Sequence, residues 1–106
     1  MFVILWQFQV NSGLEKEFEK VYGPEGAWSA LFRASPAYLG TRLLRDTSHP
    51  DLYYTLDFWA SQHSFDAFRG ENAAAYAALD RRCEPLTENE AHLGSFQAQA
   101  APLTPS

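Results

Sequence analysis

The sequence lacks most features of secreted and nucleic-acid-binding proteins. It has one cysteine, Cys83, among 106 residues, so no internal disulfide can form and nothing indicates an oxidising compartment. Basic residues are also few, because eight Lys and Arg stand against thirteen Asp and Glu, which gives a net charge of −5. No basic run is longer than Arg81-Arg82, which argues against a phosphate-binding surface. We therefore expect a cytoplasmic protein with no nucleic-acid partner.

Long hydrophobic runs are absent as well. The apolar start from Met1 to Trp6 ends at Gln7, and no basic segment precedes it. Such a run is too short for the core of a secretion signal and far below the roughly 20 residues that span a bilayer. We expect a strand at this position and no membrane partner.

Known metal and cofactor motifs are missing from the chain. It contains no HExxH, GxGxxG, P-loop or GxSxG pattern. His49, His63 and His92 are far apart in sequence, and the alternation of Glu88, Glu90 and His92 is better explained by a solvated strand face than by metal ligation. We expect no metal site and no tightly bound cofactor.

Apolar and aromatic side chains, in contrast, are plentiful. Hydrophobic residues make up 46% of the chain and aromatic residues 15%, which is ample for a packed core. A length of 106 residues fits a single domain. We place that domain at residues 1–97 and expect the Pro-containing segment 98–106 to be a mobile tail.

The first half of the chain predicts a strand followed by a broken helix. Alternating apolar residues indicate a strand at Phe2–Val10, and Ser12 with Glu15 forms a capping-box pattern for a helix. Residues 23–26, Gly-Pro-Glu-Gly, interrupt the helical pattern, which resumes between Trp28 and Phe32.

The second half predicts a hairpin, a second broken helix and a last strand. Residues 38–45 and 52–59 are typical of strands, and a cluster of turn formers separates them. Ser61 is a suitable N-cap for a helix that breaks near Gly70 and resumes over residues 73–83. A weaker strand pattern covers residues 86–97.

The resulting order β-α-β-β-α-β predicts an α+β protein with a ferredoxin-like fold, in which the helices cover one face of an antiparallel sheet. The first three strands carry apolar residues on both faces, so the uncovered face would be an exposed hydrophobic patch. We therefore expect a homodimer whose interface contains Val3, Leu5 and alternate residues of 38–45 and 52–59.

Several short motifs occur in an order that is found in one protein family. They are Phe8-Gln9-Val10-x-x-Gly13 with Glu15 and Phe18, then Tyr38-Leu39-Gly40-Thr41, then Phe58-Trp59-x-Ser61 with Phe65 and Phe68. With this combination the chain resembles the antibiotic biosynthesis monooxygenase superfamily over roughly residues 2–97. The resemblance implies a dimeric α/β barrel. Activity is less defined, because the superfamily contains cofactor-free monooxygenases, haem-degrading oxygenases, quinol-oxidising proteins and members of unknown role.

The haem-degrading branch is a poor match. Its members use an Asn on the first strand, a Trp on the later helix and a His that ligates iron. The corresponding places in this chain hold Trp6, Phe68 and the neighbourhood of Tyr76. A haem-handling role is therefore the third and disfavoured hypothesis.

The leading hypothesis is a cofactor-independent monooxygenase that acts on a small aromatic or polyketide-like substrate. Such chemistry needs a dry pocket in which a deprotonated phenol or enol reduces oxygen directly. The alternative is a non-catalytic module that binds or senses a small ligand, and a proton acceptor facing the pocket would discriminate between the two. The candidate residues are Tyr76, Trp59 and His63 for catalysis and Trp6, Tyr22, Trp28, Phe32 and Phe68 for substrate binding.

Asp57 interrupts an otherwise apolar strand. A buried carboxylate is costly unless it is paired, and Thr41 or Arg42 on the neighbouring strand, or a residue of a partner chain, could pair with it. We favour a structural bridge over catalysis at this position. Cys83 is interpreted as a packing residue, and Arg69 as an exposed residue at a helix end that could reach the mouth of the pocket.

Overall fold

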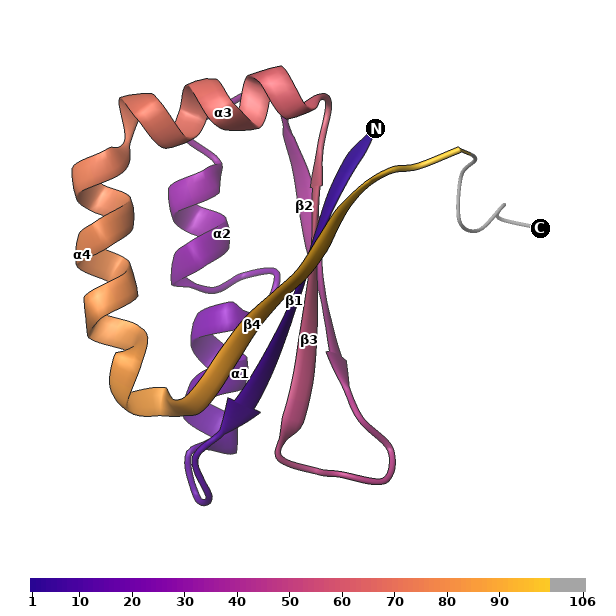
Figure 1. Ribbon diagram of the computed structural model, residues 1–106. Coiled ribbons are helices and arrows are strands. Elements are labelled where there is room, and N and C mark those ends of the chain that lie inside the picture. The colour runs from indigo at the N-terminus through magenta and orange to yellow at the C-terminus, as the bar shows by residue number, and fades with distance from the viewer. Residues whose placement is uncertain (100–106) are drawn as a thin grey trace.

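The computed structural model describes residues 1–99, which form one antiparallel sheet with helices on one face only (Figure 1). The strand order is β2-β3-β1-β4. The predicted α+β class, ferredoxin-like order and one-sided helical layer are confirmed. The elements are β1 (Phe2–Val10), α1 (Glu15–Tyr22), α2 (Ala27–Phe32), β2 (Tyr38–Arg45), β3 (Leu52–Trp59), α3 (Gln62–Glu71), α4 (Ala73–Cys83), the short 3-10 helix η1 (Glu84–Leu86) and β4 (Thr87–Gln97).

The helix starts show one correct and one wrong prediction. Ser61 caps α3, since its Oγ accepts a hydrogen bond from the backbone N–H of Ser64 at 3.1 Å. Ser12, however, does not cap α1, which begins at Glu15 without a side-chain cap. Gly13, at φ +90°, turns the chain after Ser12, and its N–H donates to the Glu15 carboxylate at 2.9 Å. The turn therefore moves Ser12 out of the capping position.

The break at residues 23–26 separates α1 from α2, as predicted. A Cβ atom on Gly26 would lie 2.2 Å from the carbonyl oxygen of Val21, so only glycine fits this close approach. Two donors from α2 and its C-cap satisfy carbonyl groups in the break: Ser29 Oγ donates to Gly23 at 3.2 Å, and Arg33 Nη2 donates to Pro24 at 2.7 Å. The break is thus a fixed part of the wall over the sheet.

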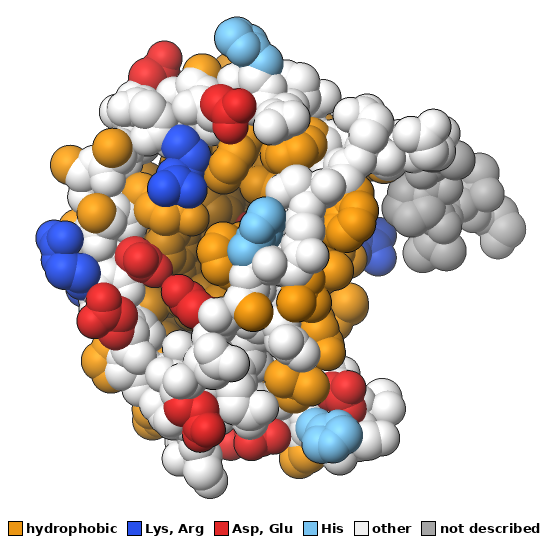
Figure 2. Space-filling model, viewed as in Figure 1, with side chains coloured by type: hydrophobic (Ala, Val, Ile, Leu, Met, Phe, Trp, Pro, Cys, Tyr) orange, Lys and Arg blue, Asp and Glu red, His pale blue; other side chains and the backbone are white. Residues whose placement is uncertain are grey.

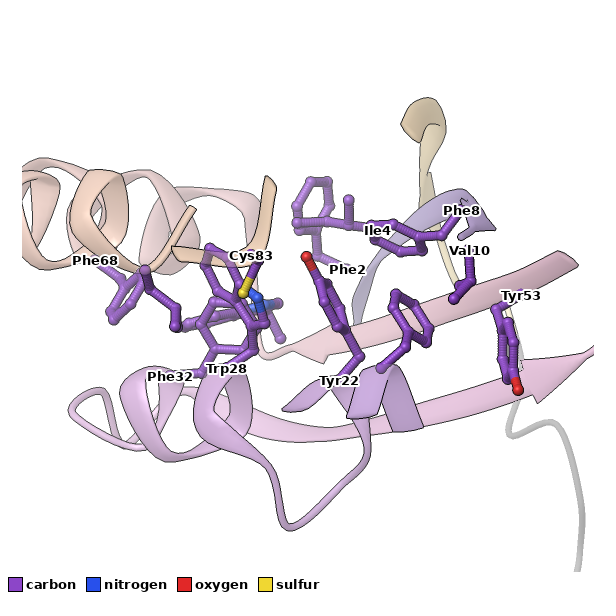
Figure 3. Close-up of a cluster of buried hydrophobic side chains, with 13 residues drawn as sticks. Phe2, Ile4, Phe8, Val10, Tyr22, Trp28, Phe32, Tyr53, Phe68 and Cys83 are labelled. Carbon is purple, nitrogen blue, oxygen red and sulfur yellow. The ribbon is translucent and has the colours of Figure 1, made fainter. Parts of the chain in front are cut away.

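The core lies between the sheet and the helices and is mainly aromatic (Figure 3). The Phe18 and Tyr22 rings stack at 4.3 Å between centroids, while Trp59 contacts Phe32 and Phe68 at 5.5 and 5.2 Å. Trp59 and Phe18 have no exposed surface. Aromatic packing of this kind holds the separate helical pieces against the sheet.

No helix in the described part of the chain covers the opposite face of the sheet (Figure 1). Val3 pairs with Phe58 and Leu5 pairs with Leu56, which places these four apolar side chains on that face. Large hydrophobic side chains that are at least a third exposed are Met1, Leu39, Leu44, Leu93 and Phe96. We call the uncovered side of the sheet, which carries Val3, Leu5, Leu56 and Phe58, the open face.

The chain ends of the described part lie side by side, because the Ala98 N–H donates to the Met1 carbonyl at 2.9 Å. The expected mobile tail falls largely on residues 100–106, which lie outside the described residues, and the domain boundary at residue 97 stays a prediction. Within residues 1–99, no helix has the length and apolarity required to cross a membrane.

Candidate functional site

A pocket opens between the helix-covered face of the sheet and helices α1, α2 and α4. Figure 2 shows it as a hollow with a hydrophobic floor and acidic side chains at its edge. The cavity volume is about 50 Å³. Its walls are formed by Trp6, Phe8, Tyr22, Trp28, Phe32, Thr41, Thr55, Asp57, Tyr76, Asp80 and Glu90.

Trp28, on α2, lies at the centre of the aromatic wall. Its ring contacts Tyr22, Phe32 and Tyr76 at centroid distances of 6.1, 5.8 and 4.9 Å. The indole Nε1 of Trp28 is buried beside Tyr22 and Cys83, and its N–H partly offsets the rise that burial causes in the pKa of both groups. The wall therefore presents a planar apolar surface suited to an aromatic ligand.

Asp57, on β3, places a carboxylate in this apolar pocket. Only 8% of the residue is exposed, and Oδ1 lies 2.7 Å from Thr41 Oγ1 on β2. Of the two partners considered on β2, Thr41 makes the contact, whereas Arg42 pairs with Leu56 on the open face. Burial raises the pKa of Asp57 to about 6, although the hydrogen bond from Thr41 opposes the shift.

The hydrogen bond at Asp57 is the first link of a longer series. Thr41 Oγ1 lies 2.5 Å from the Tyr38 hydroxyl, which lies 3.0 Å from Ser29 Oγ, and Ser29 donates to the Gly23 carbonyl at 3.2 Å. Ser29 is fully buried. This hydrogen-bond chain connects the carboxylate on β3 with the break between α1 and α2.

Two more carboxylates lie at the pocket edge, Asp80 on α4 and Glu90 on β4. Burial raises the pKa of Glu90, and the negative charges of Asp80 and Glu84 add to the shift. The Arg69 guanidinium carbon lies 4.0 Å from the centre of the Tyr76 ring. The pocket lining described here contains no basic residue, so Arg69 supplies its nearest positive charge from outside.

Cys83 interacts with Tyr22 and Trp28 behind the pocket wall, and Figure 3 shows its sulfur beside the Trp28 indole nitrogen. Burial is the largest cause that raises the pKa of Tyr22 and of Cys83. A protonated, buried thiol is a weak nucleophile, which agrees with a packing role for Cys83.

Five of the predicted site residues line the pocket together: Trp6, Tyr22, Trp28, Phe32 and Tyr76. The other three lie elsewhere. Trp59 and Phe68 are in the core beneath the lining, with at most 2% of either exposed, and His63 is exposed in the first turn of α3.

The lining also contains polar residues that were not predicted as site residues. Asp57 was expected to be a structural bridge and Glu90 to belong to a solvated face, yet both face the cavity with Thr41, Thr55 and Asp80. The sequence of β3 contained one signal that Asp57 is buried. Asp57 is an even number of residues from Tyr53 and Trp59, so it lies on the same buried face of the strand. Within residues 1–99, no three His, Cys, Asp or Glu side chains are grouped so as to hold a metal ion.

Comparisons with known proteins agree with this architecture. The family model described as antibiotic biosynthesis monooxygenase matches residues 1–81. The crystal structure of SnoaB, a cofactor-independent oxygenase from Streptomyces nogalater, is similar with a TM-score of 0.71 and 23% identity, over 95% of each chain. The heme-degrader MhuD from Mycobacterium tuberculosis, with two hemes in its active site, is similar with a TM-score of 0.70 and 24% identity, over 95% of this chain and 98% of that one. No curated protein matches the chain significantly in sequence.

Proposed function

The chain belongs to the antibiotic biosynthesis monooxygenase family, and on this premise we propose that it is a cofactor-independent monooxygenase acting on a small aromatic, polyketide-like substrate. The observation that carries the proposal is the carboxylate of Asp57 inside a pocket with aromatic walls. A pocket that only bound apolar ligands would gain nothing from a buried carboxylate, which costs stability.

The pocket residues supply what such a reaction requires of a protein. Trp28 and Trp6 offer flat apolar surfaces to a fused-ring substrate and exclude water from it. The Tyr76 hydroxyl is a donor for an oxygen atom that becomes negative when the substrate loses a proton. The reducing electrons come from the substrate anion itself, so dioxygen is the only co-reactant.

A substrate needs more room than the cavity now provides. A cavity of about 50 Å³ holds water or dioxygen, whereas a cavity that takes up benzene has roughly 150 Å³. Tyr76, which Arg69 covers from outside, is the side chain whose displacement would open the pocket on the α4 side. We therefore propose that substrate entry moves Tyr76. Trp59 and Phe68 support the wall from behind, and His63 is too exposed to serve the buried reaction.

A haem substrate fits this pocket poorly. Haem carries two propionate groups, and the lining presents Asp57, Asp80 and Glu90 without a basic residue. Negative groups on both sides would repel each other in a site of low dielectric. The acidic lining favours a substrate without carboxylates.

We also propose a homodimer formed through the open face. Leu5, Leu56 and Phe58 form an apolar patch across β1 and β3, and Phe96 on β4 extends it with 51% of its surface exposed. Val3, which pairs with both Phe58 and Phe96, is already buried within this patch, with 9% of its surface exposed. Burial of the patch in a second copy is worth about 25 cal/mol for each Å² removed from water. Pairing of two open faces would complete the dimeric α/β barrel of the family.

Oxygen uptake by the purified protein tests the proposal. Anthrone-like phenols should stimulate oxygen consumption in the presence of a chelator, with one oxygen atom incorporated into the organic product. Thr55→Leu, which fills the cavity from β3 with only apolar volume, should reduce the rate while the far-ultraviolet circular dichroism spectrum stays unchanged. If no phenol stimulates uptake although fluorescence quenching shows binding, the protein is a small-ligand binding module instead.

A further inference from the structure

We propose that Asp57 is the proton acceptor of the pocket, and that the hydrogen-bond chain from Asp57 to Gly23 is complete only when Asp57 carries a proton. The first half of this inference rests on the proposed oxygenase function. The second half concerns the resting protein alone and can be tested without a substrate.

The number of hydroxyl protons in the chain leads to this conclusion. Four O···O contacts of 2.5–3.2 Å join Asp57, Thr41, Tyr38, Ser29 and the Gly23 carbonyl. Each hydrogen bond needs its own proton, and the three hydroxyl groups supply only one each. One of the four contacts therefore lacks a proton when Asp57 is ionised.

The direction of each bond follows from the far end of the chain. A carbonyl oxygen only accepts, so Ser29 must donate to Gly23. Tyr38 must then donate to Ser29, and the 2.5 Å contact between Tyr38 and Thr41 requires Thr41 to donate to Tyr38. Thr41 has no proton left for Asp57. All four contacts become hydrogen bonds when the carboxyl group of Asp57 donates to Thr41.

With an ionised Asp57, Thr41 donates to the carboxylate instead. The three hydroxyl protons then leave one contact without a proton. That contact is either the 2.5 Å contact between Thr41 and Tyr38 or, if Ser29 and Tyr38 reverse their donation, the 3.2 Å contact with Gly23, whose carbonyl still accepts from the Gly26 N–H at 2.9 Å. The bond that Thr41 donates favours the ionised carboxylate and opposes the effect of burial, whereas the complete chain of four hydrogen bonds forms only with the protonated carboxyl group. When the Asp57 carboxylate accepts a proton from the pocket, all four contacts of the chain become hydrogen bonds.

The charges around Asp57 also favour the acceptor role. Asp80 from α4 and Glu90 from β4 face the same cavity, and Tyr76 from α4 and Tyr22 from α1 add two neutral hydroxyl groups. The Arg69 guanidinium lies over the Tyr76 ring, 4.0 Å from its centre. No basic residue in the described lining competes for the substrate's proton or holds Asp57 permanently ionised.

The proposed reaction balances with dioxygen as the oxidant. Asp57 removes a proton from the ring methylene group of an anthrone-like substrate, and the resulting carbanion transfers its electrons to dioxygen and forms a C–O bond. The peroxide anion takes the proton back from Asp57. Asp57 then removes the second C–H proton as the O–O bond breaks, and hydroxide leaves with that proton as water. The methylene compound and O₂ become a ketone and H₂O.

Titration of the Asp57 carboxyl carbon by ¹³C nuclear magnetic resonance tests the protonation of the chain. The wild-type midpoint should lie near pH 6. Tyr38→Phe removes two links and frees Thr41 to donate to ionised Asp57, so the midpoint should fall by about one pH unit. Tyr54→Phe is the matched control, since it removes a hydroxyl from the open face of β3 and should leave the midpoint unchanged. A wild-type midpoint near 4, or no shift in Tyr38→Phe, would overturn the proton count.

The pH profile of oxygen uptake tests the acceptor role. In the wild type kcat/KM should rise through the same midpoint, because only ionised Asp57 accepts a proton, and Tyr38→Phe should move this rise to lower pH. Asp57→Asn keeps the size of the side chain and should lower kcat/KM by about 10²–10⁴-fold. Asp66→Asn, an exposed change on α3, should have no effect.

The two proposals fail in different ways. Full activity of Asp57→Asn, with oxygen uptake intact in the wild type, overturns the acceptor role and leaves the oxygenase function standing. Absence of uptake with every phenol overturns the oxygenase function and with it the acceptor role, while the carbon titration still decides whether the chain holds the proton.

Discussion

The two faces of the sheet differ in chemistry, and strand β3 shows the contrast within eight residues. Its helix-covered face carries Tyr53, Thr55, Asp57 and Trp59, each at most 8% exposed, whereas its open face carries Leu52, Tyr54, Leu56 and Phe58, each partly exposed. The covered face contains hydroxyl and carboxyl groups, while the open face of this strand has no carboxylate. The covered face thus carries the groups of the proposed reaction, and the open face carries the apolar side chains of the proposed dimer.

The difference shows where the fold can tolerate a costly group. A carboxylate on the open face would be hydrated in the single chain and would oppose pairing with a second copy. Asp57 instead lies where helices exclude water, which raises its pKa, and where Thr41 is within hydrogen-bond distance. The sheet thus separates the buried carboxylate from the apolar surface of the proposed dimer.

The largest expected effect comes from a charge placed on the open face. Leu56→Asp would bury an unpaired carboxylate in each protomer of the proposed dimer, at about 3–5 kcal/mol each. The dissociation constant should therefore rise by about 10⁴-fold or more, as analytical ultracentrifugation would show. Ala77→Asp, on the exposed side of α4, is the control and should leave association unchanged. A wild-type protein that is already monomeric at micromolar concentration contradicts the dimer.

Alanine substitutions of two adjacent residues on β3 test the covered face and the open face separately. Trp59→Ala removes a fully buried ring from the core and should lower the free energy of unfolding by about 3–5 kcal/mol in urea titrations. Phe58→Ala should cost the isolated protomer less, because Phe58 is already partly exposed, and should mainly weaken association. If Trp59→Ala and Phe58→Ala lowered the free energy of unfolding equally at all protein concentrations, the two faces would not have separate roles.

Removal of the buried charge should stabilise the protein. Below about pH 4 Asp57 is protonated in both the folded and the unfolded protein. Between about pH 4 and 6 the unfolded chain loses this proton while the folded protein keeps it, so the free energy of unfolding falls as pH rises. A shift from 3.8 to about 6 corresponds to about 3 kcal/mol of destabilisation at pH 7. Asp57→Asn should recover this amount, since its amide N–H can also donate to Thr41. Thermal unfolding at pH 4.5 and pH 7 measures the gain, which should shrink at the lower pH.

The smallest expected effect is the loss of one hydroxyl group. Tyr76→Phe should weaken the binding of a phenolic ligand by less than about tenfold, because one neutral hydrogen bond is worth about 1 kcal/mol. Tyr54→Phe, which removes the hydrogen bond from Gln7 on the open face, should leave ligand binding unchanged. Isothermal titration calorimetry distinguishes the two variants. An equal effect of both would remove Tyr76 from the proposed set of polar partners.

Local patterns predicted most of the fold but only half of the site. Alternation gave the strands, and Gly-Pro-Glu-Gly gave the break between α1 and α2, because both depend on residues that are neighbours in sequence. The cap of α1 was missed because the positive φ of Gly13 turned the chain after Ser12. Five of the six aromatic residues that line the pocket were named as site residues, and Phe8 was not. Size alone did not distinguish lining residues such as Trp28 from core residues such as Trp59.

The sequence by itself determined the order of the elements, the two apolar faces of the sheet and the resemblance to the family, since each follows from local periodicity or short motifs. Only the tertiary structure decided that Asp57 faces the cavity and that Thr41, Tyr38 and Ser29 link it to Gly23. These groups come from three separate segments of the chain. Their distances depend on strand register and helix packing, which no local pattern specifies.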